Sequence, residues 1–525
     1  MKTAYLLTPD AKSIKCKKCT QSGNILLVTV IALFLIVAFV MAVLMVTANA
    51  IHLSNKQQMG TQAFNVAESG AEQAILWLRD QATPPAGTAP IMPFGELVSM
   101  DNGTYSVIIY PDQNNPSNYL KQYRIVSTGI ANGQRKIVEV VVKQASFGRY
   151  AYFTDKETSS VSGGAIWWKA GERVDGPVHS NNTGGSNFNI NYNGSTSPIF
   201  LDMVTGAGTT INYSPSRPKN ESTFLKIFAN GSKGFKLGVD PILLPPSTEN
   251  QKIAAWGSTA GFPTSSSGVW IRSNMSSGGG IYISGDCTLQ LSLDASGNQQ
   301  FTIKQGSNTT VVTLNKTTGT TTYTGPVGSG SAPSGSPIIN GVIYCSGNIT
   351  SLKGVVADNL VSNGEIVGRS AFTIATDVLN GKDITITDNL YYNTRPDKTK
   401  SFTDPVNLAA GTLGLVARNV IISSSAPANL EIDGVILAGG QTTEGSFYVA
   451  NYSSKTPVGT LKVIGGIIQK SRGPVGTFDS SSGVTKTGYT KNYSYDPRLA
   501  EYPPPYYPTT GQYERVSWRV LPDSN

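Results

Sequence analysis

Charged side chains are scarce in this chain of 525 residues, where Asp, Glu, Lys and Arg together make up 14% of the sequence. Histidine occurs only at positions 52 and 179, which excludes a multi-histidine metal centre. Residues 146–525 lack any long apolar repeat of helical period, which argues against a helical bundle. The 55 glycines, together with abundant Ser, Thr and Asn, instead favour a mainly β chain of two or three domains with many polar turns.

A basic surface patch is also missing, although the formal net charge is +8. Residues 1–23 hold five lysines and one aspartate, and so carry half of this net charge. The other half is spread over the rest of the chain, where no basic stripe interleaved with aromatic residues occurs. We therefore expect no nucleic-acid partner.

Motifs of common enzyme classes are absent as well. The sequence contains no phosphate-binding loop, zinc-ligand spacing or G-x-S-x-G motif. Cys16 and Cys19 form a C-x-x-C, but no second C-x-x-C or Cys/His pair completes a four-ligand site, so we interpret them as incidental to a basic leader. The sequence thus predicts a protein without enzymatic activity, metal or cofactor.

What the sequence does contain is a long apolar run at residues 25–48, ILLVTVIALFLIVAFVMAVLMVTA, without charge, proline or glycine. As a helix it would span about 36 Å, enough to cross the hydrocarbon core of a bilayer, and it is longer than the apolar part of a signal peptide. Lysines precede it, and the first basic residue after it is Lys56. By the positive-inside rule we expect a single-pass protein of the inner (cytoplasmic) membrane, with a cytoplasmic N-terminus and an extracytoplasmic bulk from residue 50 onward.

Helical periodicity continues beyond the apolar run, and prolines 84 and 85 then end it. The sequence therefore predicts one helix over residues 24–82, apolar in its first half and amphipathic in its second. Its second half has apolar residues on nearly one face at Ala63, Ala67, Ala71, Ile75 and Leu78.

This N-terminal sequence resembles the PilX-type members of the type IV pilins and their type II secretion relatives. The resemblance rests on a short Lys-rich leader ending at Gly23, the apolar run that follows at once, and the continuing helix with FNVAESGAEQAI. It implies that residues 1–23 are a cytoplasmic leader and that a prepilin peptidase cleaves after Gly23, leaving Asn24 as the first residue. It also implies other pilin-like subunits and the pilus assembly machinery as partners.

Val28 departs from the family pattern, because the fifth mature position of major pilins usually carries a glutamate that pairs with the terminal amine of a neighbouring subunit. A carboxylate at membrane depth is costly unless it is paired, so its presence normally marks a functional contact. Its loss argues against a bulk filament subunit and suits a minor pilin or a tip component. Asn24 is a second departure, since major pilins usually begin with Phe or Met.

Three strand-like runs follow a connector rich in Pro and Gly, at residues 104–110, 123–129 and 135–143. The last two flank Asn132-Gly133, a strong signal for a tight β-hairpin. Apolar and polar residues alternate within them, as in an antiparallel sheet with one solvated face. We expect residues 83–145 to form a pilin-like β-meander headgroup packed on the second half of the helix.

Residues 146–525 show short Val/Ile-rich runs between polar turns, which favour a large, β-helix-like extracytoplasmic domain and a mainly β fold for the chain. Motifs such as YFTDKE and AIWWKAGERVDGPVHSN resemble a domain of unassigned function that often follows PilX-type N-termini in envelope proteins. Residues 317–337 are of low complexity and predict a mobile surface loop. We expect the aromatic, proline-rich C-terminal segment to pack against the end of this domain.

Two sets of residues in this domain are candidates for a special role. Cys287 and Cys345 lie in the exported part, where a disulfide is chemically permitted, but their pairing does not follow from sequence. The loop DGPVHSNN holds Asp175, His179 and Asn181, which form either a hydrogen-bonded β corner or a functional loop. Four further charged residues could converge as in carbohydrate-active β-helices: Asp358, Arg369, Asp377 and Asp388.

Three functional hypotheses remain open at this point. The leading one is a structural, minor pilin-like subunit that presents a large β domain, with a surface glycan or a secreted substrate as a candidate partner. The second is a membrane-tethered adhesin or carbohydrate-binding module that never enters a filament. The third is an envelope polysaccharide lyase or hydrolase on a β-helix scaffold.

Overall fold

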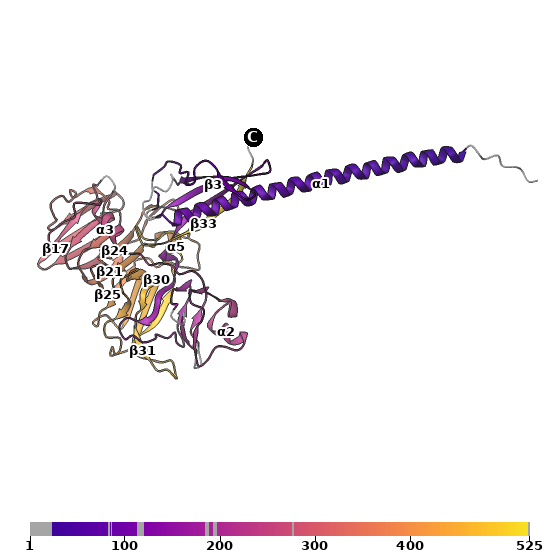
Figure 1. The fold of residues 1–525 in the computed structure, drawn as a ribbon. Coiled ribbons are helices and arrows are strands. Elements are labelled where there is room, and N and C mark those ends of the chain that lie inside the picture. The colour runs from indigo at the N-terminus through magenta and orange to yellow at the C-terminus, as the bar shows by residue number, and fades with distance from the viewer. Residues whose placement is uncertain are drawn as a thin grey trace, which may run out of the picture.

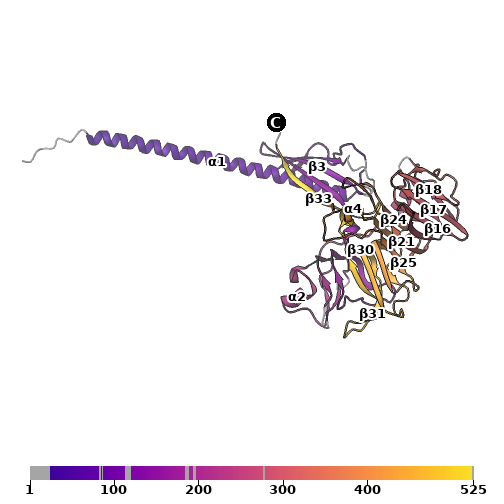
Figure 2. The ribbon, with the colours of Figure 1, turned by 180° about the vertical axis from the view of Figure 1, so that it is seen from behind.

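A long helix, α1 (Asn24–Arg79), projects as a rod from a body made mainly of β-strands (Figure 1). Figure 2 shows the same arrangement from behind. The fold is therefore mainly β with a long N-terminal helix, as the sequence predicts. The computed structural model describes residues 24–81, 84–85, 87–112, 120–183, 188–192, 197–275 and 278–522.

The two halves of α1 have different surroundings. Apolar side chains of the first half, from Ile25 to Val46, are exposed. The second half packs on a small antiparallel sheet, and Ile75 of the predicted apolar face is only partly buried there. The buried stripe has helical spacing and consists mostly of small residues: Ala63, Val66, Ala67, Gly70, Ala71, Ala74 and Leu78.

Two glycines let this half of α1 approach the sheet closely. A Cβ at Gly70 would lie 2.4 Å from Ser127 Oγ and 2.7 Å from the Tyr105 ring, and a Cβ at Gly129 would lie 2.4 Å from Ala63 O. These distances are far below van der Waals contact, so neither position accepts a side chain unless the helix shifts. Gly70 weakens the isolated helix but permits its packing.

The small sheet has the strand order β1–β2–β3–β4–β33, and every neighbouring pair is antiparallel. Asn132 and Gly133 have positive φ in the turn between β3 and β4, which confirms the predicted hairpin. The strands are β1 (Val98–Met100), β2 (Gly103–Pro111), β3 (Gln122–Ala131), β4 (Gln134–Ser146) and β33 (Thr509–Leu521).

Strand β33 belongs to the small sheet although its residues fall in the range expected for the large domain. Phe147 N donates to Pro508 O (3.1 Å), so the chain leaves and re-enters the small sheet at one place. We call residues 147–508 the large region; it is an insertion between two neighbouring strands. The proline-rich segment before β33 packs on the rest of the large region, where the Thr373 hydroxyl donates to Pro505 O. β33 itself pairs with β4 and reaches the large region through the ion pair between Glu514 and Arg149.

The large region is built around two parallel ladders of short strands, whose apolar side chains form a continuous core. The first ladder runs β14 (Ile281–Ser284), β20 (Val342–Cys345), β24 (Ala371–Thr376), β26 (Thr412–Ala417), β28 (Asn429–Ala438), β30 (Gly459–Arg472), β5 (Tyr152–Ser159), β7 (Val178–Ser180), β10 (Val204–Gly206) and β12 (Phe235–Leu237). The second runs β15 (Cys287–Leu293), β21 (Ile349–Val356), β25 (Ile384–Tyr392), β27 (Val420–Ile422) and β29 (Phe447–Val449).

Strands β28 and β30 bend at glycines and so take part in more than one set of pairings. Gly434 and Gly465 are paired neighbours with φ of 145° and 148°, a conformation that glycine reaches most readily. Before the bend β30 pairs with β32 (Thr485–Ser494), and after it with β5. The pairings establish parallel ladders, and the β-helix-like architecture stays a prediction.

An antiparallel meander departs from the ladders between Cys287 and Cys345. The prediction of a mobile loop over residues 317–337 is wrong for β18, whose threonines have high strand propensity and which pairs with β17. After β15, each strand of the meander pairs with the one before it: β16 (Gln299–Gln305), β17 (Asn308–Asn315), β18 (Thr320–Thr324) and β19 (Ser336–Pro337).

Short elements complete the described part of the large region. The helices are α2 (Glu221–Ile227), α3 (Glu249–Trp256), α4 (Pro405–Ala409) and α5 (Arg498–Glu501), with 3-10 turns η1 (Phe147–Arg149) and η2 (Gly231–Lys233). The other strands are β6 (Arg173–Val174), β8 (Asn189–Asn191), β9 (Ile199–Phe200), β11 (Asn212–Ser214), β13 (Gly268–Ile271), β22 (Leu360–Ser362), β23 (Glu365–Gly368) and β31 (Gly476–Phe478).

Candidate functional site

The predicted cleavage and assembly positions lie at the start of α1. Asn24 is the first residue of the helix, while Gly23 lies outside the described residues. Val28 is 61% exposed, in line with the apolar side chains around it. α1 is long and apolar enough to cross a membrane, and its most apolar stretch is not covered by the rest of the chain. The helix thus offers an apolar rod to lipid or to other helices.

His179, in β7, is held at both ring nitrogens inside the large region. It is 1% exposed, and its ring stacks on that of Phe153 with 5.2 Å between centroids. Nδ1 lies 2.8 Å from Thr205 Oγ1, and Nε2 lies 2.9 Å from Asn181 Oδ1. Burial lowers the pKa of the imidazole, which favours its neutral form.

The side-chain amide of Asn181 fixes the tautomer of this histidine. Its Nδ2 donates to Asp155 Oδ1 (2.8 Å) and Ile242 O (2.6 Å), and its Oδ1 accepts from Ile242 N (2.8 Å). Since Oδ1 can only accept, Nε2 of His179 carries the proton. Nδ1 faces the Thr205 hydroxyl, which also lies 3.0 Å from Val178 O, the acceptor to which it donates. Both ring nitrogens thus contact buried polar groups of the protein. The geometry is that of a hydrogen-bonded β corner.

Asp175, the third residue of the predicted loop site, makes its contacts elsewhere. Its carboxylate accepts from Tyr495 N (2.6 Å) and Ser494 Oγ (3.4 Å) and forms an ion pair with Lys398. Tyr495 is 320 residues further along the chain. Asp175 thus fastens the segment before β7 to the end of β32, and its hydrogen bonds are structural.

Cys287 and Cys345 meet in the core of the large region. They are buried free thiols at the start of β15 and the end of β20, and their Sγ atoms lie 3.8 Å apart. The Cys345 thiol also donates to Gly285 O (3.2 Å). The hydrogen bond with Cys345, together with burial, raises the pKa of Cys287. The two thiols lie at the base of the meander, where a disulfide would join β15 to β20.

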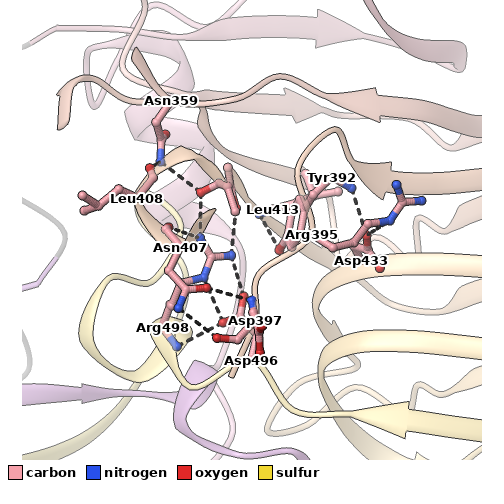
Figure 3. A network of polar contacts seen from close by, with 12 residues as sticks. Asn359, Tyr392, Arg395, Asp397, Asn407, Leu408, Leu413, Asp433, Asp496 and Arg498 are labelled. Carbon is pink, nitrogen blue, oxygen red and sulfur yellow. Dashed lines mark hydrogen bonds and ion pairs between the residues drawn. The ribbon is translucent and has the colours of Figure 1, made fainter. Parts of the chain in front are cut away.

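A buried network around Arg498 joins α5 to the end of α4 (Figure 3). Arg498 donates to the carbonyls of Ala410 (2.6 Å), Gly411 (3.1 Å) and Asn407 (3.2 Å). Its remaining donors pair with Asp496, at 2.7 Å for the shortest contact. The guanidinium thereby satisfies backbone carbonyls that the short helix leaves unpaired. Every donor of this arginine is used to hold the protein together.

A second part of the network surrounds Asp433, a fully buried carboxyl group in β28 (Figure 3). Oδ2 accepts from Tyr392 N (3.0 Å) and lies 3.9 Å from Arg395 Nε, whereas Oδ1 has no hydrogen-bond partner among the described residues. Arg395 pairs mainly with Glu431, through contacts of 2.9 and 3.0 Å. Burial raises the pKa of Asp433 to about 7. Such a pKa suits acid–base chemistry, but this carboxyl is closed to a substrate.

No sequence pattern pointed to the buried ion pair between Arg472 of β30 and Glu157 of β5. The charged atoms are 2.9 Å apart, and each side chain is 1% exposed. Arg472 also donates to Ile166 O (2.8 Å) and lies over the Trp168 ring at 4.2 Å. The two residues are 315 positions apart and meet only because β30 and β5 are paired.

The four charged residues that a glycan-processing site would bring together have separate partners. No group of three or more His, Cys, Asp or Glu side chains suited to a metal ion occurs in the described part of the chain. Each of the four has a different partner: Asp358 accepts from Thr394 N (2.9 Å), Asp377 from Asn380 N (3.1 Å) and Asp388 from Asn389 N (2.8 Å), while Arg369 lies over the Tyr502 ring (5.3 Å).

Comparison with known proteins gives a family model and solved structures. A family model described as "Domain of unknown function (DUF4900)" matches residues 118–209, from β3 of the small sheet to β10 of the large region. No curated protein matches. Among solved structures, the competence-associated pilin ComZ from Thermus thermophilus matches with a TM-score of 0.28 and 15% identity, over 88% of this chain and 98% of that chain. A TM-score this low supports no argument about the fold.

Proposed function

We propose that this protein is a minor pilin-like structural subunit of a type IV pilus or a related secretion pseudopilus. The observation that carries the proposal is the division of α1 into an exposed apolar half and a half that packs on the small sheet. Exposed apolar surface of this extent requires a cover. Lipid of the inner membrane supplies it before assembly, and the helices of other pilin-like subunits supply it in a filament.

The sequence supports the same proposal. The PilX-type leader and apolar run imply processing by a prepilin peptidase, a cytoplasmic N-terminus and contact with the assembly machinery. Val28, in place of the usual glutamate, favours a rare or terminal subunit. The large region favours this too, because a body of that size beside the small sheet would clash if every subunit of a filament carried it.

The role that we propose is structural and not enzymatic. Both ring nitrogens of His179 contact protein groups, and Asp433 is buried away from solvent. The N–H groups of Arg498 are all used in hydrogen bonds to backbone carbonyls and to the Asp496 carboxylate. These polar groups stabilise the large region, and no cofactor or metal enters the proposal. The large region is then the part that the subunit displays outside the membrane.

Processing and filament incorporation test the proposal directly. A tagged full-length chain should migrate faster in cells with the prepilin peptidase than in cells without it, and should co-purify with sheared pili. Gly23→Asp is the matched control, since it should give the slow form even when the peptidase is present. Identical electrophoretic mobility of the tagged chain in both strains would refute the pilin hypothesis. It would favour the alternative, a membrane-tethered adhesin or carbohydrate-binding protein outside any filament.

A further inference from the structure

A cleft of about 680 Å³ lies where the small sheet meets the large region. One side is formed by residues 78–81 at the end of α1 and residues 508–513 at the start of β33. The other side is formed by residues 240–247 and the first turn of α3. The cleft thus lies at the C-terminal end of α1, remote from the apolar half of the helix. Its volume lies within the usual range for ligand sites, roughly 300–1,000 Å³.

Side-chain amides line this cleft from five separate segments. Three of them are held in place by the protein: Gln81 Nε2 donates to Trp77 O (3.0 Å), Gln144 Oε1 accepts from Lys121 N (3.1 Å), and Gln251 Nε2 donates to Tyr506 O (2.6 Å). The side-chain amides of the other three have no protein partner among the described residues, and each is at least partly exposed: Asn250, Gln441 and Gln512.

The charge of the lining is low. Arg79 and Asp80 pair with each other at 3.4 Å, which leaves Asp240 as the one other charged side chain among the described lining residues. Leu243, which is 63% exposed, and the prolines at 241, 245 and 246 add an apolar wall. An ionic ligand would therefore find little counter-charge in this cleft.

This combination points to a class of ligand. An amide offers a donor and an acceptor together, and a sugar hydroxyl needs the same pair of partners. The C–H faces of a sugar ring can lie against the leucine and proline wall while its hydroxyl edge meets the three unpaired amides. We propose that the cleft binds an uncharged oligosaccharide. This binding goes beyond the proposed function, because it does not require that the chain enter a filament.

The test is calorimetric titration of the full-length chain in a detergent without a sugar headgroup. The neutral probes are cellohexaose, mannohexaose and chitohexaose, and the comparison probes are hexagalacturonate and an uncharged decapeptide. We expect binding of at least one neutral probe. Gln441→Ala and Gln512→Ala, both on accessible positions, should each weaken it about fivefold, the value of one net hydrogen bond. Gln290→Ala, an exposed glutamine of β15 outside the cleft, is the matched control and should leave binding unchanged.

Three results would overturn the proposal. The first is that no neutral hexasaccharide binds. The second is that only hexagalacturonate or the decapeptide binds, which would assign the cleft to an acidic glycan or to peptide. The third is binding that the cleft variants leave unchanged or that Gln290→Ala weakens equally. None of these outcomes bears on prepilin processing, so this proposal and the proposed function fail independently.

Discussion

Replacing Arg472 by methionine should strongly destabilise the large region. Methionine keeps much of the aliphatic length that packs on Trp168 but removes the cation that faces Glu157 at 2.9 Å. Because both side chains are 1% exposed, the remaining carboxylate is buried without a counter-charge, which typically costs about 3–5 kcal/mol. Urea unfolding of the full chain, followed by tryptophan fluorescence, measures the loss, since Trp168 lies beneath the guanidinium.

A surface ion pair provides the matched control. Lys486 and Asp479 are 3.0 Å apart in the same region, but the lysine side chain is 61% exposed. Solvent screens such a pair, so Lys486→Met should cost less than about 1 kcal/mol. If Arg472→Met lost no more free energy of unfolding than this control, the reasoning from burial would be wrong.

The double variant Arg472→Met/Glu157→Gln separates charge from packing. Glutamine keeps the shape of Glu157 without its charge, so the double variant should be more stable than Arg472→Met alone. Burial already raises the pKa of Glu157 in the parent, and loss of the cation should raise it further. The folded state then binds more protons than the unfolded state, so Arg472→Met should lose stability as pH rises above about 4.5. A double variant no more stable than the single, or a single variant without this pH slope, would refute the electrostatic account.

Three further predictions follow from buried contacts. Gly129→Val should cost at least about 2 kcal/mol, because its Cβ would lie 2.4 Å from Ala63 O. Thermal unfolding measures this against Gly164→Val, whose Cβ would lie at an ordinary contact distance of 3.8 Å from Ser162 Oγ, and equal losses would contradict the packing argument. Burial raises the pKa of Asp433 to about 7, so the folded state holds a proton that the unfolded state releases and stability falls from about pH 4 to pH 7. Asp433→Asn should remove this dependence of the free energy of unfolding on pH. If the difference in stability between the variant and the parent were the same at every pH, Asp433 would not be the group responsible. Cys287 and Cys345 should resist alkylation in denaturant after export and react only after reduction; peptide mass mapping checks this, and full alkylation without reductant would exclude the disulfide.

The local elements were the predictable part of the fold. The apolar run and the helical period after it predicted α1, and the strand period with Asn132-Gly133 predicted the hairpin of the small sheet. Both could be predicted because each of these patterns is contained in a short stretch of sequence. A hydrogen-bonded β corner at His179 was one of the two alternatives for this loop, since Asp, Asn and Ser favour local hydrogen bonds. Its partner Thr205 was not predicted, because that contact depends on the parallel register of β7 and β10.

The long-range contacts were not predictable. Nothing in the sequence of β33 shows whether this strand pairs within the small sheet or within the large region. Its partner β4 lies on the other side of the large region in the sequence. The Arg472–Glu157 pair has the same origin, in the register of β30 and β5. The composition of the threonine-rich segment predicted a mobile loop, but β18 forms a strand there because it pairs with β17. Composition alone does not show such pairing.

The insertion between β4 and β33 has a mechanical consequence. These strands are antiparallel neighbours, so a pull on the large region draws the end of one and the start of the other in the same direction. The load is thus divided between two strands that are hydrogen-bonded to each other. A region held by two links at one place is less free to swivel than one that hangs from a single linker. The small sheet therefore fixes how the large region is oriented relative to α1.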